Sequence, residues 1–324
     1  MELDRLNSIH LRAHIVYSQL EQARKILLES GNESMIPQTE TYYFELLNRL
    51  YDEEYPLAKL MEASDFVIHA EGPAASEQIP HLNIVNWLFS NVEKQIKQMA
   101  KSVLSLSIND INGAMKALDI RLTGMAPGSI YAGFSINPPQ PMPLFGTAEE
   151  EQAISSIKDT ITSLIDLPRF VTKDKVEDGL SEIFPDPAIR DSALVAAFNL
   201  SPTGKKGILS LGMSSPLHSK KTSTLNVMDR AVLRESIRNP VIKNIKKGSF
   251  IGEIRAIDLD RNRVNVRWDD GTIRCAIRIT TEKAKQLIGK TVKVTGSYEE
   301  NAVGKPRLMR VEEIKLFDNL SLEI

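Results

Sequence analysis

The sequence RVNVRWDDGTIRCAI, residues 263–277, has the pattern of two β-strands joined by a tight turn. Val264 and Val266 are two residues apart, so their side chains are expected on one face of a strand. The pair Asp270 and Gly271 is a strong hairpin signal, because glycine readily adopts the positive φ that such a turn requires. The two strands therefore predict a β-hairpin at the centre of a longer region of similar pattern.

The region around this hairpin predicts a small β-barrel. Strand-like runs also cover residues 249–257, 290–294 and 307–314, and a short helix is expected at residues 281–287. Five short strands with a single helix between the third and fourth are typical of an oligonucleotide-binding (OB) barrel, and an SH3-like barrel fits nearly as well. Closure is expected because an open sheet of five short strands would expose two unpaired edges.

The 324 residues are enough for more than one domain. We expect an α+β fold, with an N-terminal α+β region over residues 1–136, a helical middle region over residues 144–240 and the barrel over residues 247–317. Four prolines within residues 137–143 predict an extended connector. The pattern leaves open whether residues 1–240 form one domain or two.

Periodicity places the elements of the first 240 residues. Apolar residues three and four apart predict helices, and alternation predicts strands. Helices are expected at residues 7–29, 39–54, 80–103, 147–165, 187–198 and 225–238. Strands are expected at residues 65–70, 120–125, 130–136 and 207–213, and a loop at residues 214–224.

Charge is divided unevenly along the chain. Residues 243–317 contain 17 Lys and Arg against 10 Asp and Glu, whereas residues 1–242 contain 23 against 30. Such asymmetry indicates either a nucleic-acid contact or the docking of one half of the chain on the other.

The candidate nucleic-acid-binding residues are cations of the barrel. Because Val264 and Val266 are expected to face inward, Arg263 and Arg267 should face outward and could hold phosphates. Trp268 or Tyr298 could stack on bases. Trp268, however, is two residues after Val266, so it is expected on the same strand face as the valines, in the core. The alternative is that these charges only keep the barrel soluble and block edge pairing. The candidate residues are Arg255, Arg263, Arg267, Arg274, Arg278, Lys293 and Arg307.

No catalytic or metal-binding signature is present, and no cofactor is expected. The single cysteine, Cys275, excludes an intramolecular disulfide and is expected to be buried. His10 and His14 would share a helix face, but no third metal ligand is placed near them. An enzyme is therefore not the expectation.

The strands at residues 120–125 and 130–136 are separated by a predicted turn. Pro127 and Gly128 suit the central positions of a type II turn, and the following amides could form a small anion nest. Ser129 could act as a nucleophile only with a base beside it. His69 is the nearby candidate, but the sequence gives no sign that the two side chains meet.

The N-terminal residues do not resemble a secretory signal, and no run approaches the roughly 18 apolar residues of a membrane span. We therefore expect a cytoplasmic protein without membrane contact.

Several turn motifs occur in a familiar order. They are Ile68-His69-Ala70-Glu71-Gly72-Pro73, then Pro127-Gly128-Ser129, then GSFIGEI at residues 248–254 and GKP at residues 304–306. This order resembles a group of uncharacterised bacterial proteins found on mobile elements beside toxin–antitoxin or phage-defence genes. The resemblance covers residues 65–317 and implies a non-enzymatic accessory role, without carrying over any catalytic residue.

The sequence thus predicts an accessory protein that binds DNA or RNA through the basic barrel. The alternative is a protein-interaction subunit or antitoxin without nucleic-acid binding, whose acidic N-terminal part would cover a partner encoded nearby. The oligomeric state is not predicted.

Overall fold

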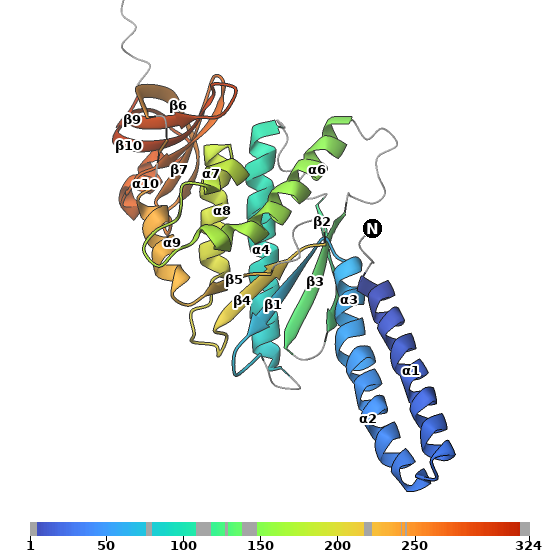
Figure 1. Ribbon diagram of the computed structural model, residues 1–324. Coiled ribbons are helices and arrows are strands. Elements are labelled where there is room, and N and C mark those ends of the chain that lie inside the picture. The colour runs from blue at the N-terminus through green and yellow to red at the C-terminus, as the bar shows by residue number, and fades with distance from the viewer. Residues whose placement is uncertain are drawn as a thin grey trace, which may run out of the picture.

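The computed structural model describes residues 5–75, 80–107, 118–126, 129–137, 148–216, 222–240, 242–243 and 245–317. The fold class is α+β, as predicted: a sheet covered by helices forms a body, and a closed barrel lies at one side of it (Figure 1). The predicted turn at Pro127 and Gly128, and the connector after residue 137, lie outside the described residues.

The body contains a five-stranded sheet in the order β2-β3-β1-β4-β5, and all of its neighbouring strands are antiparallel. Strands from before and after the proline-rich connector therefore pair in one sheet. The short strand β5 replaces the end of the predicted loop at residues 214–224 and the start of the predicted helix at residues 225–238, because four residues carry too little pattern to be recognised. The strands are β1 (Phe66–Glu71), β2 (Asp119–Ala126), β3 (Ile130–Asn137), β4 (Ser210–Ser214) and β5 (Ser223–Asn226).

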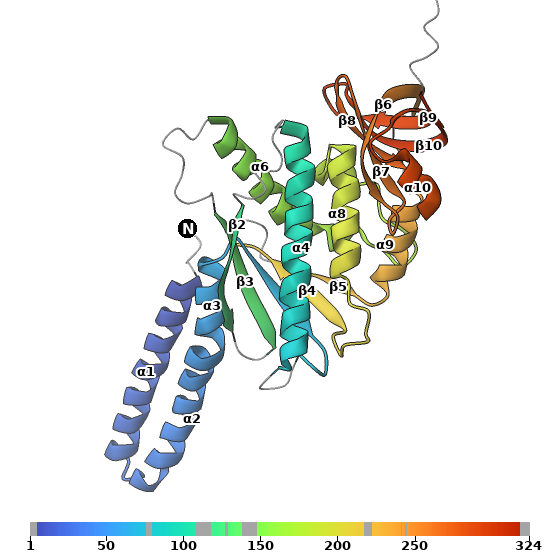
Figure 2. The same cartoon turned by 180° about the vertical axis from the view of Figure 1, so that it is seen from behind.

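Helices cover one face of this sheet (Figure 2). The apolar stripe of α4 packs its buried Leu88 and Met99 into a core that includes Ile68 of β1 and Leu211 of β4. Beside α4 lie α6 and α8, and α9 packs on α8. The helical elements of this layer are α4 (Leu82–Ser107), α6 (Ala148–Ser163), η3 (Leu164–Phe170), α7 (Leu180–Ile183), α8 (Pro187–Leu200) and α9 (Asp229–Arg238).

A helical hairpin projects from the opposite side of the body (Figure 1). Its last helix, α3, packs Leu60 and Met61 against Val67 on the second face of the sheet. Only the base of the hairpin has its own buried core, around Ile9 and Leu47. The elements are α1 (Arg5–Glu29), η1 (Glu33–Met35), α2 (Ile36–Asn48), η2 (Arg49–Glu54) and α3 (Tyr55–Glu62).

The C-terminal residues form a closed barrel in the order β10-β8-β7-β6-β9. Strands β8 and β10 are parallel and the other pairs are antiparallel, with the helix α10 between the third and fourth strands. This is an OB-like barrel, as predicted. Its elements are β6 (Lys246–Asp258), β7 (Arg263–Trp268), β8 (Gly271–Ala276), α10 (Thr281–Leu287), β9 (Thr291–Glu300) and β10 (Pro306–Leu316).

The barrel has its own apolar core, which includes Val264, Val266 and Cys275. Burial raises the pKa of the Cys275 thiol to about 12, so the group stays protonated at neutral pH. Trp268 is only partly buried; its ring meets Phe250 edge-on at one end of the core, with centroids 5.1 Å apart. In the described part of the chain, no helix combines the length and the apolar character needed to cross a membrane.

Candidate functional site

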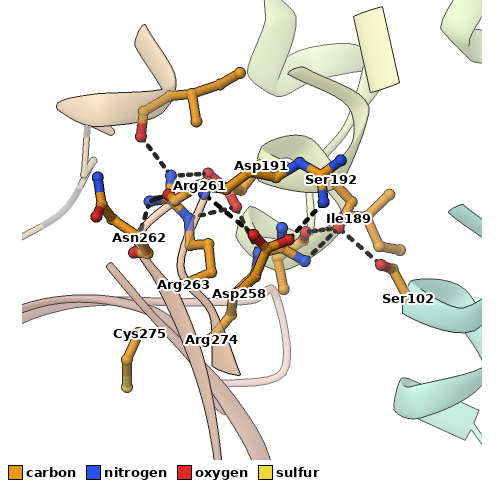
Figure 3. A network of polar contacts seen from close by, with 12 residues as sticks. Ser102, Ile189, Asp191, Ser192, Asp258, Arg261, Asn262, Arg263, Arg274 and Cys275 are labelled. Atoms are coloured by element: carbon orange, nitrogen blue, oxygen red, sulfur yellow. Dashed lines mark hydrogen bonds and ion pairs between the residues drawn. The ribbon is translucent and has the colours of Figure 1, made fainter. Parts of the chain in front are cut away.

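Two arginines of the barrel meet one carboxylate of α8 (Figure 3). Arg263 donates from Nε and Nη2 to the two oxygens of Asp191, at 2.9 and 2.6 Å. Arg274 Nε lies 2.5 Å from Asp191 Oδ2, and its Nη1 donates to Ser192 Oγ at 2.8 Å. Arg263 Nη2 also donates to the carbonyl oxygen of Ile237 at 2.6 Å, so the contact reaches α9.

The Asp191 side chain is 1% exposed and depends on this pairing for its charge. Burial by itself would raise the pKa of Asp191, but the charges of Arg274 and Arg263, with their hydrogen bonds, lower that pKa to about 2. The carboxylate is therefore ionised at neutral pH. A buried, ionised group of this kind is tolerated only while its partners stay in place.

Two further ion pairs link the body and the barrel. Arg307 Nε of β10 donates to Asp186 Oδ2 at 3.2 Å, while the other oxygen of Asp186 caps the amides of Ala188 and Ile189 at the start of α8. Arg190 of α8 donates from Nη2 to Glu299 Oε2 of β9 at 2.7 Å. In this pair the cation is on the body and the carboxylate is on the barrel. The barrel thus docks through charges of both signs.

This docking changes the expected binding surface. Arg263, Arg274 and Arg307 do point away from the barrel core, as predicted, but α8 and its cap cover them instead of solvent. Their charges are matched by Asp191 and Asp186, so they are not part of an exposed phosphate-binding surface. In OB barrels the second and third strands form much of the ligand face, and here those strands are β7 and β8.

The other four candidates, Arg255, Arg267, Arg278 and Lys293, are exposed. Arg255 is paired with Glu253 at 3.0 Å on the same strand. Among the described residues of the barrel from 245 to 317, 12 Lys and Arg are exposed against six Asp and Glu. The barrel surface that remains after docking is therefore still basic.

Part of this basic surface lies on β6, β9 and the end of β10. Lys293 of β9 is in register with Ile251 of β6 on one side and with Lys315 of β10 on the other. Lys290 immediately precedes β9, and Lys247 stands four residues before Ile251 on β6. We define the exposed basic face as Lys247, Lys290, Lys293 and Lys315.

The carboxylates that receive the barrel arginines were not recognised from sequence. Asp191 does carry a signal, because it lies in a helix whose residues are mostly apolar. A charged residue in that position needs a partner. The sequence does not say that the partner lies 72 residues further along.

The structure also brings together two residues whose meeting the sequence did not indicate. Ser129 Oγ lies 2.5 Å from His69 Nε2 on the sheet face opposite α4. Among the described residues, no group of three or more His, Cys, Asp or Glu is arranged to hold a metal ion.

Comparison with known proteins adds little to this picture. No protein-family model matches the chain, and no curated protein matches it. Among solved structures, the hypothetical protein ygiW from E. coli is similar at 17% identity, covering 26% of this chain and 85% of that chain, with a TM-score of 0.19.

Proposed function

We propose that the chain binds nucleic acid through the exposed surface of its C-terminal barrel. The observation that carries this proposal is the excess of 12 exposed Lys and Arg over six exposed Asp and Glu after the barrel has docked on the body. Cations on a barrel surface follow a phosphate backbone without reading its sequence. DNA and RNA are both suitable ligands for such a surface. An accessory role beside toxin–antitoxin or phage-defence genes stays a prediction of the sequence resemblance.

Reversing charge on the exposed basic face is expected to weaken binding. In the variant Lys290→Glu/Lys293→Glu/Lys315→Glu, we expect at least about a tenfold loss of affinity and a salt dependence that is less steep by about two to three released counterions. The measurement is fluorescence anisotropy with labelled single-stranded and double-stranded DNA and with RNA, at about 50 and 200 mM salt.

The matched control is Lys173→Glu/Lys175→Glu/Lys205→Glu, which reverses three exposed charges of the body. It should bind nearly as well as the unmodified chain. The proposal is refuted if the unmodified chain binds no oligonucleotide with a dissociation constant below about 1 µM at about 50 mM salt. Equal loss in both triple variants would show that only net charge matters.

The helical hairpin supports a second candidate function, association with a second copy of the chain. Beyond its base, the hairpin buries almost nothing, and isolated helices of this kind are marginally stable in water. Nine of its large apolar side chains are more than a third exposed, which is unusual for a surface without a partner. They are Leu11, Ile15, Tyr17, Ile26, Leu28, Met35, Tyr42, Phe44 and Tyr51.

Charge favours a second copy as the occupant. The described residues of α1 contain four Arg and Lys against two Glu, whereas α2 and η2 together contain five Asp and Glu against one Arg. Within one hairpin the two helices are already joined by Arg12–Glu54 and Arg24–Glu40, each at 2.6 Å. Two hairpins packed with α1 against α2 of the other copy would repeat this complementarity and bury both apolar surfaces.

Light scattering during size-exclusion chromatography tests this association. We expect twice the chain mass of 36.2 kDa at concentrations above about 10 µM, and a shift to monomer in Ile26→Glu/Phe44→Glu. The control Gln22→Glu/Gln38→Glu introduces the same charges at exposed polar positions of the same helices and should stay dimeric. A monomer at every concentration would contradict the candidate.

A further inference from the structure

In the described part of the chain, α3 packs over one end of the second face of the sheet. Helix α3 packs over Val67 of β1, but His69 and Glu71, which follow on the same face, extend beyond that contact. Across the strand pairs, His69 is opposite Tyr131 of β3 and Gly212 of β4. Gly212 has no side chain, and Thr222 Cγ2 lies 3.0 Å from the position that a Cβ of Gly212 would occupy, beside His69 Cβ at 3.5 Å.

Three side chains on this face form a chain of polar contacts. Ser129 Oγ is 2.5 Å from His69 Nε2, and His69 Nδ1 is 3.4 Å from Glu71 Oε1. The other oxygen of Glu71 accepts a hydrogen bond from Ser210 Oγ at 2.7 Å, which fixes the carboxylate. A hydroxyl, an imidazole and a carboxylate in this order can activate the hydroxyl as a nucleophile.

The imidazole is held in one orientation. The ring of Tyr131 stacks on it in parallel, with centroids 3.8 Å apart and 6° between the planes. With Nε2 as the acceptor for the serine hydroxyl, the proton of the neutral ring is on Nδ1, which faces Glu71. The geometry is thus suited to proton transfer from Ser129 to His69.

The local environment keeps His69 in the form of a base. Burial lowers the pKa of His69, and the nearby Glu71 carboxylate opposes this shift only in part. Burial also raises the pKa of Tyr131, so the phenol stays neutral. The His69 side chain is 14% exposed and Ser129 is half-buried, so both side chains keep some contact with solvent.

We propose that Ser129, with His69 as its base and Glu71 as a positioning residue, hydrolyses a carboxylic ester. Ser129 Oγ forms a bond to the carbonyl carbon while its proton moves to His69 Nε2. The bond from carbon to the leaving oxygen then breaks, and the alcohol departs with the proton from His69. Water attacks the acylated serine, its proton passes through His69 to Oγ, and a carboxylic acid is released.

This proposal departs from the expectation of a non-enzymatic protein, and it is independent of nucleic-acid binding. His69 lies on β1 of the body and Ser129 immediately precedes β3, whereas the exposed basic face lies on the barrel. Either proposal can fail while the other holds, because ester hydrolysis and oligonucleotide binding are measured separately and are tested with variants at different residues.

A fluorophosphonate probe tests the nucleophile on the full-length chain. We expect labelling at Ser129, located by mass spectrometry of the labelled peptide, and hydrolysis of p-nitrophenyl acetate and butyrate. In Ser129→Ala labelling should be lost, and in Ser129→Ala and His69→Gln ester hydrolysis should fall by at least about 100-fold. Thermal unfolding of each variant checks that the chain is still folded.

The control Ser156→Ala removes a partly buried serine of α6 whose hydroxyl donates to the backbone oxygen of Gln152, and labelling should be unchanged. Two variants separate the charge of Glu71 from its position. Glu71→Asp keeps the charge and should keep part of the ester hydrolysis rate of the unmodified chain. Glu71→Gln removes the charge and should change the pH profile of hydrolysis. A folded chain that takes no label, takes it at another serine, or hydrolyses esters no faster than Ser129→Ala overturns the proposal.

Discussion

Replacing Asp191 with alanine should lower the free energy of unfolding by about 3–5 kcal/mol, because it leaves the buried charges of Arg263 and Arg274 without their carboxylate. The loss should appear first as separation of the barrel from the body. The two tryptophans allow this to be followed, since Trp87 lies on α4 and Trp268 lies in the barrel. Urea unfolding of Trp87→Phe and Trp268→Phe backgrounds would report each part separately.

Two further variants make the Asp191 prediction specific. Asp174→Ala removes an exposed acid and should change stability by less than about 0.5 kcal/mol. The triple variant Asp191→Leu/Arg263→Met/Arg274→Met removes all three charges and should recover much of the loss. A change below about 1 kcal/mol in Asp191→Ala would mean that the ion pairs do not hold the barrel on α8.

Gly252→Ala should destabilise the barrel by about 3 kcal/mol, near the upper end of the usual cost of overpacking. Strand β6 pairs with β9 up to Glu253 and with β7 from Glu253 onward, so Gly252 lies where the strand turns from one neighbour to the other. A methyl group there would stand 2.2 Å from the backbone oxygen of Arg267. Since that contact is with backbone, the closed barrel would have to open locally.

Gly124→Ala is the control for this effect. Its added carbon would meet only the end of the Leu60 side chain, at 3.3 Å, and that side chain can move. Thermal unfolding followed by Trp268 fluorescence should therefore shift for Gly252→Ala and stay nearly constant for Gly124→Ala. Equal unfolding temperatures would mean that the close approach of β6 to β7 is not needed for closure.

The barrel was predictable from sequence because its signals are local. Alternation around Val264, the turn at Gly271 and the helix at residues 281–287 all depend on neighbouring residues. The long amphipathic helix α4 was predicted for the same reason. The hairpin helices over residues 7–29 and 39–54 were predicted as well, but α3 and the projection of the hairpin away from the body were not.

What the sequence could not provide is the meeting of distant residues. Nothing near Arg263 indicates that its partner is Asp191 on a helix of the body, and nothing near Ser129 indicates that β3 lies beside His69 on β1. Both pairs depend on how strands and domains are arranged in space. The sequence therefore predicts a solvent-facing position for the three arginines that the body covers, and it places no base beside the serine.

Hydrogen–deuterium exchange of the full-length chain, with and without a bound oligonucleotide, is the most direct test of binding through the exposed basic face. We expect slower exchange around Lys290, Lys293 and Lys315, and no change around Arg263 or in α8. Protection confined to the body, or faster exchange in α8 as Arg263 and Arg274 leave Asp191 for the ligand, would contradict binding through the exposed basic face.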